Sequence, residues 1–171
     1  GRSVAAIAHA FGMDVLAYSR TVRRECASLA RYCSLKELLA SSDVVSLHCP
    51  LTPDTRGMID QKAICGMKNG AILLNCGRGP LLSEQDVADA LNSGKLYAAA
   101  MDVADTDPIA PDSPLLRAKN CILTPHVAWA TLESRRRLVK IAEENLSAFC
   151  AGKPQNTVLT PFQRAVQEKI E

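Results

Sequence analysis

The segment AILLNCGRG, residues 71–79, decides the fold class of this 171-residue chain. Its first four residues are apolar and Asn75 follows them, so the segment lacks polar alternation, which predicts a buried strand of a parallel sheet. Further strands are predicted at residues 13–18, 44–47, 96–101 and 121–124. Helices are predicted at residues 2–11, from Ser34, from Asp60 to about Met67, from Ser83 through Leu91, and from Thr131 to Gly152. This alternation predicts an α/β fold, a Rossmann-like doubly wound parallel sheet with helices on both faces.

The composition excludes several classes of protein. Apolar residues form 47% of the chain, which excludes a disordered tail, and the net charge is only +2. That charge balance argues against nucleic acid as a partner, and the absence of a long apolar run argues against a membrane. The seven cysteines are odd in number and lack C-x-x-C spacing, which predicts free thiols, no metal site and a reducing, cytoplasmic location.

Unusual residues follow the predicted strands one after another. They are Ser19-Arg20, His48-Cys49-Pro50, Cys76-Gly77-Arg78-Gly79, Asp102 and Pro125-His126. In an open parallel sheet, ligands bind beyond the carboxyl ends of the strands. Five such groups in succession predict one ligand site at that edge.

Two of these residues carry recognisable chemistry. The planar guanidinium of Arg78 matches a carboxylate in a bidentate way, although a surface arginine in a turn is the simpler interpretation of this residue alone. His126 is the usual type of proton donor for a carbonyl that accepts hydride at neutral pH, although a lone histidine is more often structural. The preceding loop supplies Asp105 and Asp107, and a carboxylate beside a histidine favours its protonated form.

Three motifs together resemble the D-isomer-specific 2-hydroxyacid dehydrogenase family. They are Asn-x-x-Arg-Gly at 75–79, Met101-Asp102-Val103 with the acid-Pro pair at 107–108, and Thr124-Pro125-His126. The segments 48–55 and 114–116 add to the resemblance, which covers residues 1–158 as a nucleotide-binding domain and leaves 159–171 as a C-terminal tail. Residues 126–130 and 152–156 look closest to the hydroxypyruvate reductase (glycerate dehydrogenase) branch.

The resemblance implies an oxidoreductase that interconverts a 2-oxo acid and a D-2-hydroxy acid, such as hydroxypyruvate or glyoxylate and D-glycerate or glycolate. Arg78 would bind the substrate carboxylate, His126 would act as the acid and base, and Asp107 would pair with His126. Asp102 would face the nicotinamide and Trp129 would close the substrate pocket. The remaining cofactor-binding residues would be Gly1, Ser19, Arg20, His48, Cys49, Pro50, Thr55, Cys76 and Gly77. A homodimer is expected for the complete protein.

Two positions depart from the family pattern. The family has a Glu where this chain has Asp107, whose side chain is about 1.5 Å shorter, so we expect its role to survive with reduced efficiency. NAD enzymes place Asp or Glu after the second strand, where it binds the ribose hydroxyls. This chain has Ser19 and Arg20 there, with Arg23 and Arg24 nearby, so NADP is expected to be accepted alongside NAD.

The phosphate-binding fingerprint G-x-G-x-x-G is expected before the first helix, and Gly1 fits its last glycine. The resemblance therefore implies that the sheet lacks its first, central strand and that the isolated fragment has little activity. Two alternatives stay open: a dinucleotide-binding interaction protein like the corepressor relatives of the family, and a non-catalytic fragment.

Overall fold

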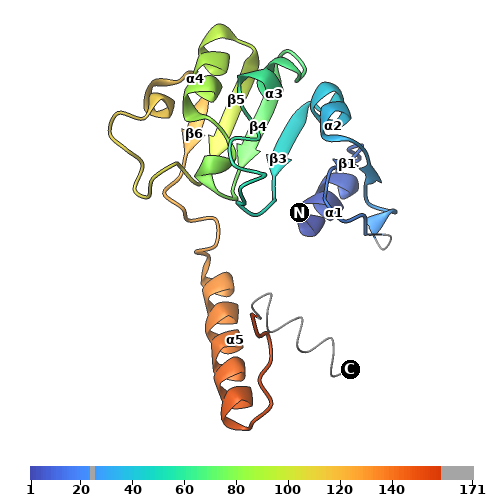
Figure 1. Ribbon diagram of the computed structural model, residues 1–171, viewed down its shortest axis with the longest axis vertical. Helices are drawn as coiled ribbons and strands as arrows, with labels where there is room; N and C mark the ends of the chain where they lie inside the picture. Colours follow the sequence, from blue (N-terminus) through green and yellow to red (C-terminus); the bar gives the residue numbers. More distant parts are fainter. Residues whose placement is uncertain (24–25, 159–171) are drawn as a thin grey trace. The chain divides into compact units, whose positions relative to one another are not determined.

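The computed structural model describes residues 1–23 and 26–158 and shows helices that alternate with parallel strands (Figure 1). In chain order the elements are α1 (Arg2–Ala10), β1 (Leu16–Ala17), β2 (Arg31–Tyr32), α2 (Leu35–Ser41), β3 (Val44–Leu47), α3 (Gln61–Cys65), β4 (Ala71–Asn75), η2 (Gly79–Leu81), α4 (Glu84–Ser93), β5 (Leu96–Met101), η3 (Pro114–Arg117), β6 (Cys121–Leu123) and α5 (Leu132–Cys150). The chain forms two compact units: the first contains residues 1–128 and the second begins at Trp129. The expected C-terminal tail, 159–171, lies outside the described residues.

Four strands of the first unit form one parallel sheet in the order β3-β4-β5-β6. Their carboxyl ends are in register, since Leu47 lies opposite Asn75, Asn75 opposite Met101, and Met101 opposite Leu123. The residues that follow these strands therefore start from one edge of the sheet. The bounds of β3, β4 and β5 are those predicted from the sequence, and β6 ends one residue early.

β1 and β2 form a separate parallel sheet of two strands. β1 is shorter than the predicted strand 13–18, and β2 was not predicted. In the described part of the chain, β1 pairs only with β2, and β3 pairs only with β4, so each of these strands keeps an open edge. This arrangement is the Rossmann-like α/β fold expected from the sequence, without a strand between its two halves.

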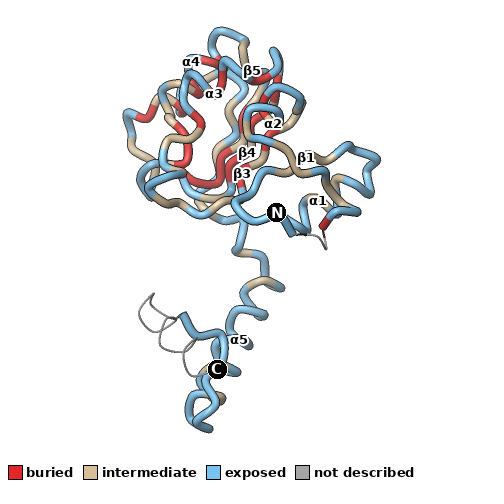
Figure 2. The backbone as a smooth tube through the Cα atoms, turned by 45° about the vertical axis from the view of Figure 1, so that its right-hand side comes forward, coloured by how far each residue is buried: buried red, intermediate tan, exposed pale blue. Residues whose placement is uncertain are grey.

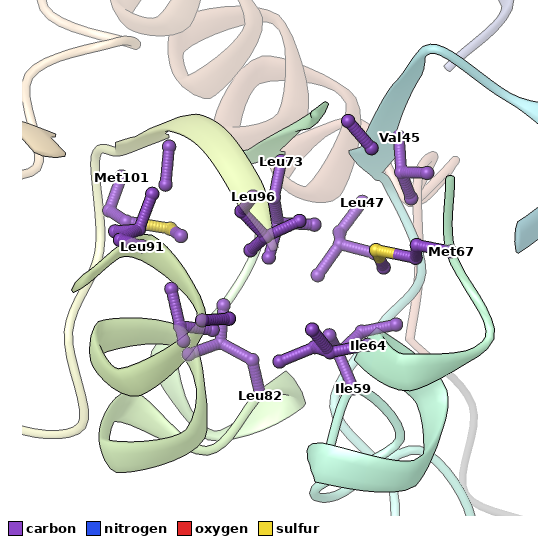
Figure 3. Packing of buried hydrophobic residues seen from close by; sticks show 14 of the residues in the cluster. Val45, Leu47, Ile59, Ile64, Met67, Leu73, Leu82, Leu91, Leu96 and Met101 are labelled. Carbon is purple, nitrogen blue, oxygen red and sulfur yellow. The ribbon is translucent and has the colours of Figure 1, made fainter. Parts of the chain in front are cut away.

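The hydrophobic core lies between one face of the four-stranded sheet and helices α3 and α4 (Figure 3). Burial alternates along β4, where Leu73 is fully buried and its neighbours Ile72 and Leu74 are half-buried. Figure 2 shows the buried residues concentrated in this part of the chain. The predicted cover on the second face is incomplete, because α1 has no buried residue and Ile122 of β6 stays 66% exposed.

Side-chain caps begin four helices where the sequence places them. Ser34, Asp60, Ser83 and Thr131 accept hydrogen bonds from the backbone N–H groups of Glu37, Ala63, Asp86 and Ser134. Gly94 ends α4 with a left-handed φ of 79°, a conformation that glycine adopts without strain. These local signals fixed the helix starts because they depend on neighbouring residues only.

In the second unit, α5 has no buried residue. The apolar face predicted for this helix, which includes Leu138, Ile141 and Phe149, is exposed. Among the described helices, none has both the length and the apolar character needed to cross a membrane.

Candidate active site

The site lies at the carboxyl edge of the four-stranded sheet. His48, Cys76, Asp102 and Thr124 directly follow β3, β4, β5 and β6. Because the strand ends are in register, segments far apart in the sequence meet at this edge.

Asp107 and His126 are in direct contact. Oδ2 of Asp107 lies 2.9 Å from Nδ1 of His126, and the two side chains are 65% and 39% exposed. An ionised carboxylate only accepts hydrogen bonds, so Nδ1 donates to Asp107 and Nε2 is left for another partner. The shorter side chain of Asp107 therefore reaches the histidine.

A buried carboxylate holds the loop that carries this histidine. Asp102 is only 4% exposed. Its Oδ1 accepts hydrogen bonds from the Thr124 hydroxyl at 2.6 Å and the Val127 N–H at 2.9 Å, and its Oδ2 accepts one from the Ala128 N–H at 2.8 Å. His126 lies inside this loop with φ 54°, in the left-handed region that few residues other than glycine adopt.

These hydrogen bonds also decide the charge of Asp102. Burial by itself raises the pKa of the Asp102 carboxyl, but the hydrogen bonds from Thr124, Ala128 and Val127 outweigh burial, so its pKa is lowered. Asp102 therefore stays ionised at neutral pH and keeps the loop in place.

Asn75 shapes the turn that presents Arg78. Asn75 is fully buried at the end of β4; its Nδ2 donates to the Arg78 carbonyl at 2.9 Å and its Oδ1 accepts from the Gly77 N–H at 3.0 Å. The exposed Arg78 guanidinium donates to the Gly77 carbonyl at 2.7 Å. Since a guanidinium has five N–H donors, this contact leaves others for a ligand.

Gly79 joins this turn to the loop after β5. A Cβ added at Gly79 would lie 1.9 Å from the carbonyl oxygen of Ala104, so the two backbones touch with no room for a side chain. Ala104 precedes Asp107 by three residues. The contact therefore brings the Arg78 turn next to the segment that carries the histidine's partner.

Two of the expected cofactor-binding residues, Gly1 and His48, lie side by side. A Cβ added at Gly1, the N-cap of α1, would lie 3.4 Å from the Cβ of His48. His48 Nε2 is 3.0 Å from the Ser46 hydroxyl, and burial lowers the pKa of His48 and favours the neutral imidazole.

Thr55 closes the turn after β3. Its hydroxyl donates to the Pro50 carbonyl at 2.8 Å and accepts from the Thr52 N–H at 2.8 Å. The Cys49 thiol, half-buried, donates to the Met58 sulfur at 3.6 Å. Thr55 and Cys49 thus have structural partners within the loop 49–58.

Four other expected site residues are exposed: Ser19, Arg20, Cys76 and Trp129. Ser19 and Arg20 follow β1, a strand of the two-stranded sheet. Trp129 begins the second compact unit, and its expected role at the substrate pocket stays a prediction.

Sequence reasoning missed the side chains that support these residues. In the sequence analysis, Asn75 and Thr124 appear only as members of family motifs, without a role for either side chain. Glu84 is not singled out there, although the Glu84 carboxylate is hydrogen-bonded to the loop after β5. A polar residue at the end of an apolar strand was the available signal for Asn75. For Glu84 the sequence shows only an acidic residue in the first turn of a helix, which is common.

The model of the family described as D-isomer specific 2-hydroxyacid dehydrogenase, NAD binding domain, matches residues 1–128. The chain belongs to this family. The matched range is the first compact unit, which contains the Asp107–His126 pair and the Arg78 turn.

Two curated relatives and one solved structure show how the dehydrogenase domain compares. The chain is 52% identical to a hydroxypyruvate reductase of Blautia hydrogenotrophica, over 92% of this chain and 49% of the relative. It is 44% identical to a glyoxylate reductase of Aeropyrum pernix, over 92% and 48%. The NAD-complexed D-isomer specific 2-hydroxyacid dehydrogenase of Lactobacillus delbrueckii ssp. bulgaricus is 31% identical with a TM-score of 0.86, over 93% of this chain and 52% of that structure. The chain thus spans about half the length of the proteins it matches.

Proposed function

We propose that the protein containing this dehydrogenase domain interconverts hydroxypyruvate and D-glycerate, or glyoxylate and glycolate. The observation that carries the proposal is the 2.9 Å contact between Asp107 and His126 at the carboxyl edge of the sheet. The names of the two curated relatives, hydroxypyruvate reductase and glyoxylate reductase, support these substrates.

In this proposal His126 moves the proton. With Nδ1 bonded to Asp107, Nε2 donates a proton to the substrate oxygen during reduction and removes it during oxidation. Asp107 keeps the ring in this tautomer and stabilises the charged imidazolium. The Arg78 guanidinium binds the carboxylate of the acid and orients the neighbouring carbonyl.

The residues of the domain fit a nicotinamide dinucleotide, which supplies the hydride when bound. α1 begins at Gly1 without a side-chain cap, which leaves its first N–H groups for a phosphate, and the backbone of Gly1 packs against His48. The exposed Arg20 can bind a 2′-phosphate, and Ser19 brings no carboxylate to repel it. We therefore propose that NADPH is accepted as well as NADH.

The test of the reaction uses the protein expressed from the complete reading frame that contains this sequence. We expect NAD(P)H-dependent reduction of hydroxypyruvate or glyoxylate, and a kcat lowered roughly 10²- to 10⁴-fold by His126→Gln. His9→Gln, in the exposed last turn of α1, is the matched control and keeps full activity. If His126→Gln has the same kcat as His9→Gln, the proton-transfer role is wrong.

Cofactor choice is tested with the same protein. We expect Arg20→Ala to lower kcat/KM for NADPH about 10-fold, the loss of one charge-assisted hydrogen bond, while kcat/KM for NADH changes little. Arg117→Ala removes an exposed arginine of η3 and is the control. A far lower KM for NADH than for NADPH in the unmodified protein contradicts the proposal.

We also propose that the complete protein is a cytoplasmic homodimer. All seven cysteines of the chain are free thiols, which supports a reducing compartment. Light scattering of the complete protein tests the dimer, and a monomeric mass contradicts it.

A further inference from the structure

One carboxylate, that of Glu84, binds both ends of the loop that carries Asp107. Glu84 lies in the first turn of α4 and is bonded to the loop that follows β5. Its Oε1 accepts the Asp105 N–H at 2.8 Å, and its Oε2 accepts the Ser113 hydroxyl at 2.5 Å. Asp107 lies between Asp105 and Ser113 in the sequence, so Glu84 holds together the two ends of the loop 105–113 that contains it.

The surroundings make these anchors strong. Ser113 is only 6% exposed and Glu84 is half-buried, so water competes weakly for their contact. The carboxylate lies at the N-terminus of α4, where the helix dipole favours a negative charge. Hydrogen bonds to an ionised acceptor are about twice as strong as neutral ones. The backbone contact between Gly79 and Ala104 holds the loop from a second side.

In this position the loop 105–113 brings the carboxyl of Asp105 close to that of Glu84. Burial and the nearby Glu84 raise the pKa of the Asp105 carboxyl, while Arg56 lowers it. The backbone N–H of Asp105 nevertheless stays bonded to Glu84 at 2.8 Å. Glu84 is therefore close to the Asp105 carboxyl and is bonded to its backbone at the same time.

We propose that Glu84 is a positioning residue that keeps Asp107 within hydrogen-bond reach of His126. The idea rests on the proposed function. An aspartate has a short side chain, so the 2.9 Å contact with His126 depends on where the loop backbone lies. A shift of about 1 Å breaks such a contact, and a misplacement of this size in an active site lowers the rate about 10²-fold.

The first experiment compares two acidic residues of the same helical turn in the protein from the complete reading frame. Glu84→Ala removes both anchors of the loop. Asp86→Ala removes a carboxylate that bonds the Gln61 N–H at 2.9 Å and does not touch the loop. We expect Glu84→Ala to lower kcat 10- to 100-fold with little change in the KM of the cofactor, and Asp86→Ala to retain kcat. Equal losses in the two variants overturn the proposal.

Two further variants separate positioning from a general loss of structure. Glu84→Gln keeps an acceptor for the Asp105 N–H, so we expect kcat within a few-fold of the unmodified protein. Asp107→Glu, added to Glu84→Ala, lengthens the acid and is expected to restore at least part of the lost kcat. A merely structural defect is not repaired by a longer side chain at residue 107, so failure of this rescue overturns the proposal.

Hydrogen exchange tests the loop without any activity measurement. We expect the amides of residues 103–113 to exchange faster in Glu84→Ala than in Asp86→Ala, and to a smaller extent in Ser113→Ala. Unchanged exchange overturns the inference even if the enzyme is active. If the unmodified protein reduces neither acid, the proposed function and the catalytic part of this inference fail, while faster exchange still shows that Glu84 fixes the loop.

Discussion

The two ends of the first compact unit follow the same sequence rules and reach different degrees of packing. In the region from β3 to β6, Leu73 is fully buried, and Val87 and Leu91 of α4 are buried as well. In α1, the equally periodic Ile7 is 59% exposed, and Phe11, which directly follows the helix, is 82% exposed. An apolar period predicts a helix, but burial requires a surface to pack against.

The candidate site residues show the same contrast between a well-packed and an exposed region. The supports of His126 and Arg78 come from the well-packed region, where Asp102 and Asn75 are buried and hydrogen-bonded. Ser19 and Arg20, for which we propose a role in cofactor choice, follow β1 of the small sheet and are exposed. Four predictions, made with six substitutions, test this contrast.

The largest effect is expected from Gly79→Ala. The new Cβ would meet the Ala104 carbonyl at 1.9 Å, so backbone must move, and we expect a loss of more than about 4 kcal/mol or no folded protein. Gly12→Ala, near α1, has open space and only a left-handed φ of 78°, so it costs about 1–2 kcal/mol. Urea unfolding of both variants measures the difference, and similar losses contradict the contrast.

The second largest difference in stability between the two regions is expected when a large apolar side chain is cut back to alanine. Leu73→Ala leaves a cavity in the centre of the core and is expected to cost about 2–5 kcal/mol. Ile7→Ala in α1 removes a mostly exposed side chain and should change stability by about 0.5 kcal/mol or less. The midpoints of urea unfolding report both values. A large loss of unfolding free energy for Ile7→Ala would contradict this contrast, because it would mean that the Ile7 side chain is packed in solution.

Asp102→Asn should give a pH-dependent loss. The lowered pKa of Asp102 means that its stabilisation is complete above its ordinary pKa and disappears as the pH falls through the lower, folded value. We expect the variant to be about 2 kcal/mol less stable at pH 7 and the gap to narrow below about pH 4. Unfolding curves across this range test the sign, and a constant gap contradicts it.

The smallest effect is expected at a helix cap. Ser34→Ala removes the hydroxyl that accepts the Glu37 N–H at 3.1 Å at the start of α2 and should cost about 1 kcal/mol. Hydrogen exchange of residues 35–41 is the suitable measurement, because a local change near the small sheet need not alter global unfolding. Unchanged exchange would show that α2 does not depend on this cap.

The sequence predicted what local chemistry decides. Continuous apolar runs located β3, β4 and β5, and Ser34, Asp60, Ser83 and Thr131 located the helix starts. It could not predict β2 or the half-open face of the sheet, because these depend on which surfaces meet. The pairing of Asp107 with His126 was anticipated through family resemblance, whereas the contacts of Glu84 and Gly79 that place the loop join segments distant in sequence.

The exposure of Ser19 and Arg20 has a consequence for the proposed cofactor preference. The residues proposed for carboxylate binding and proton transfer, Arg78, Asp107 and His126, follow strands of the four-stranded sheet, whose buried side chains form the hydrophobic core. Ser19 and Arg20 follow β1, and both side chains are exposed. Under the proposed roles, substitutions at these two positions change the groups offered to the dinucleotide without removing any side chain from the core, so the proposed preference for NADH or NADPH can change at little cost in stability.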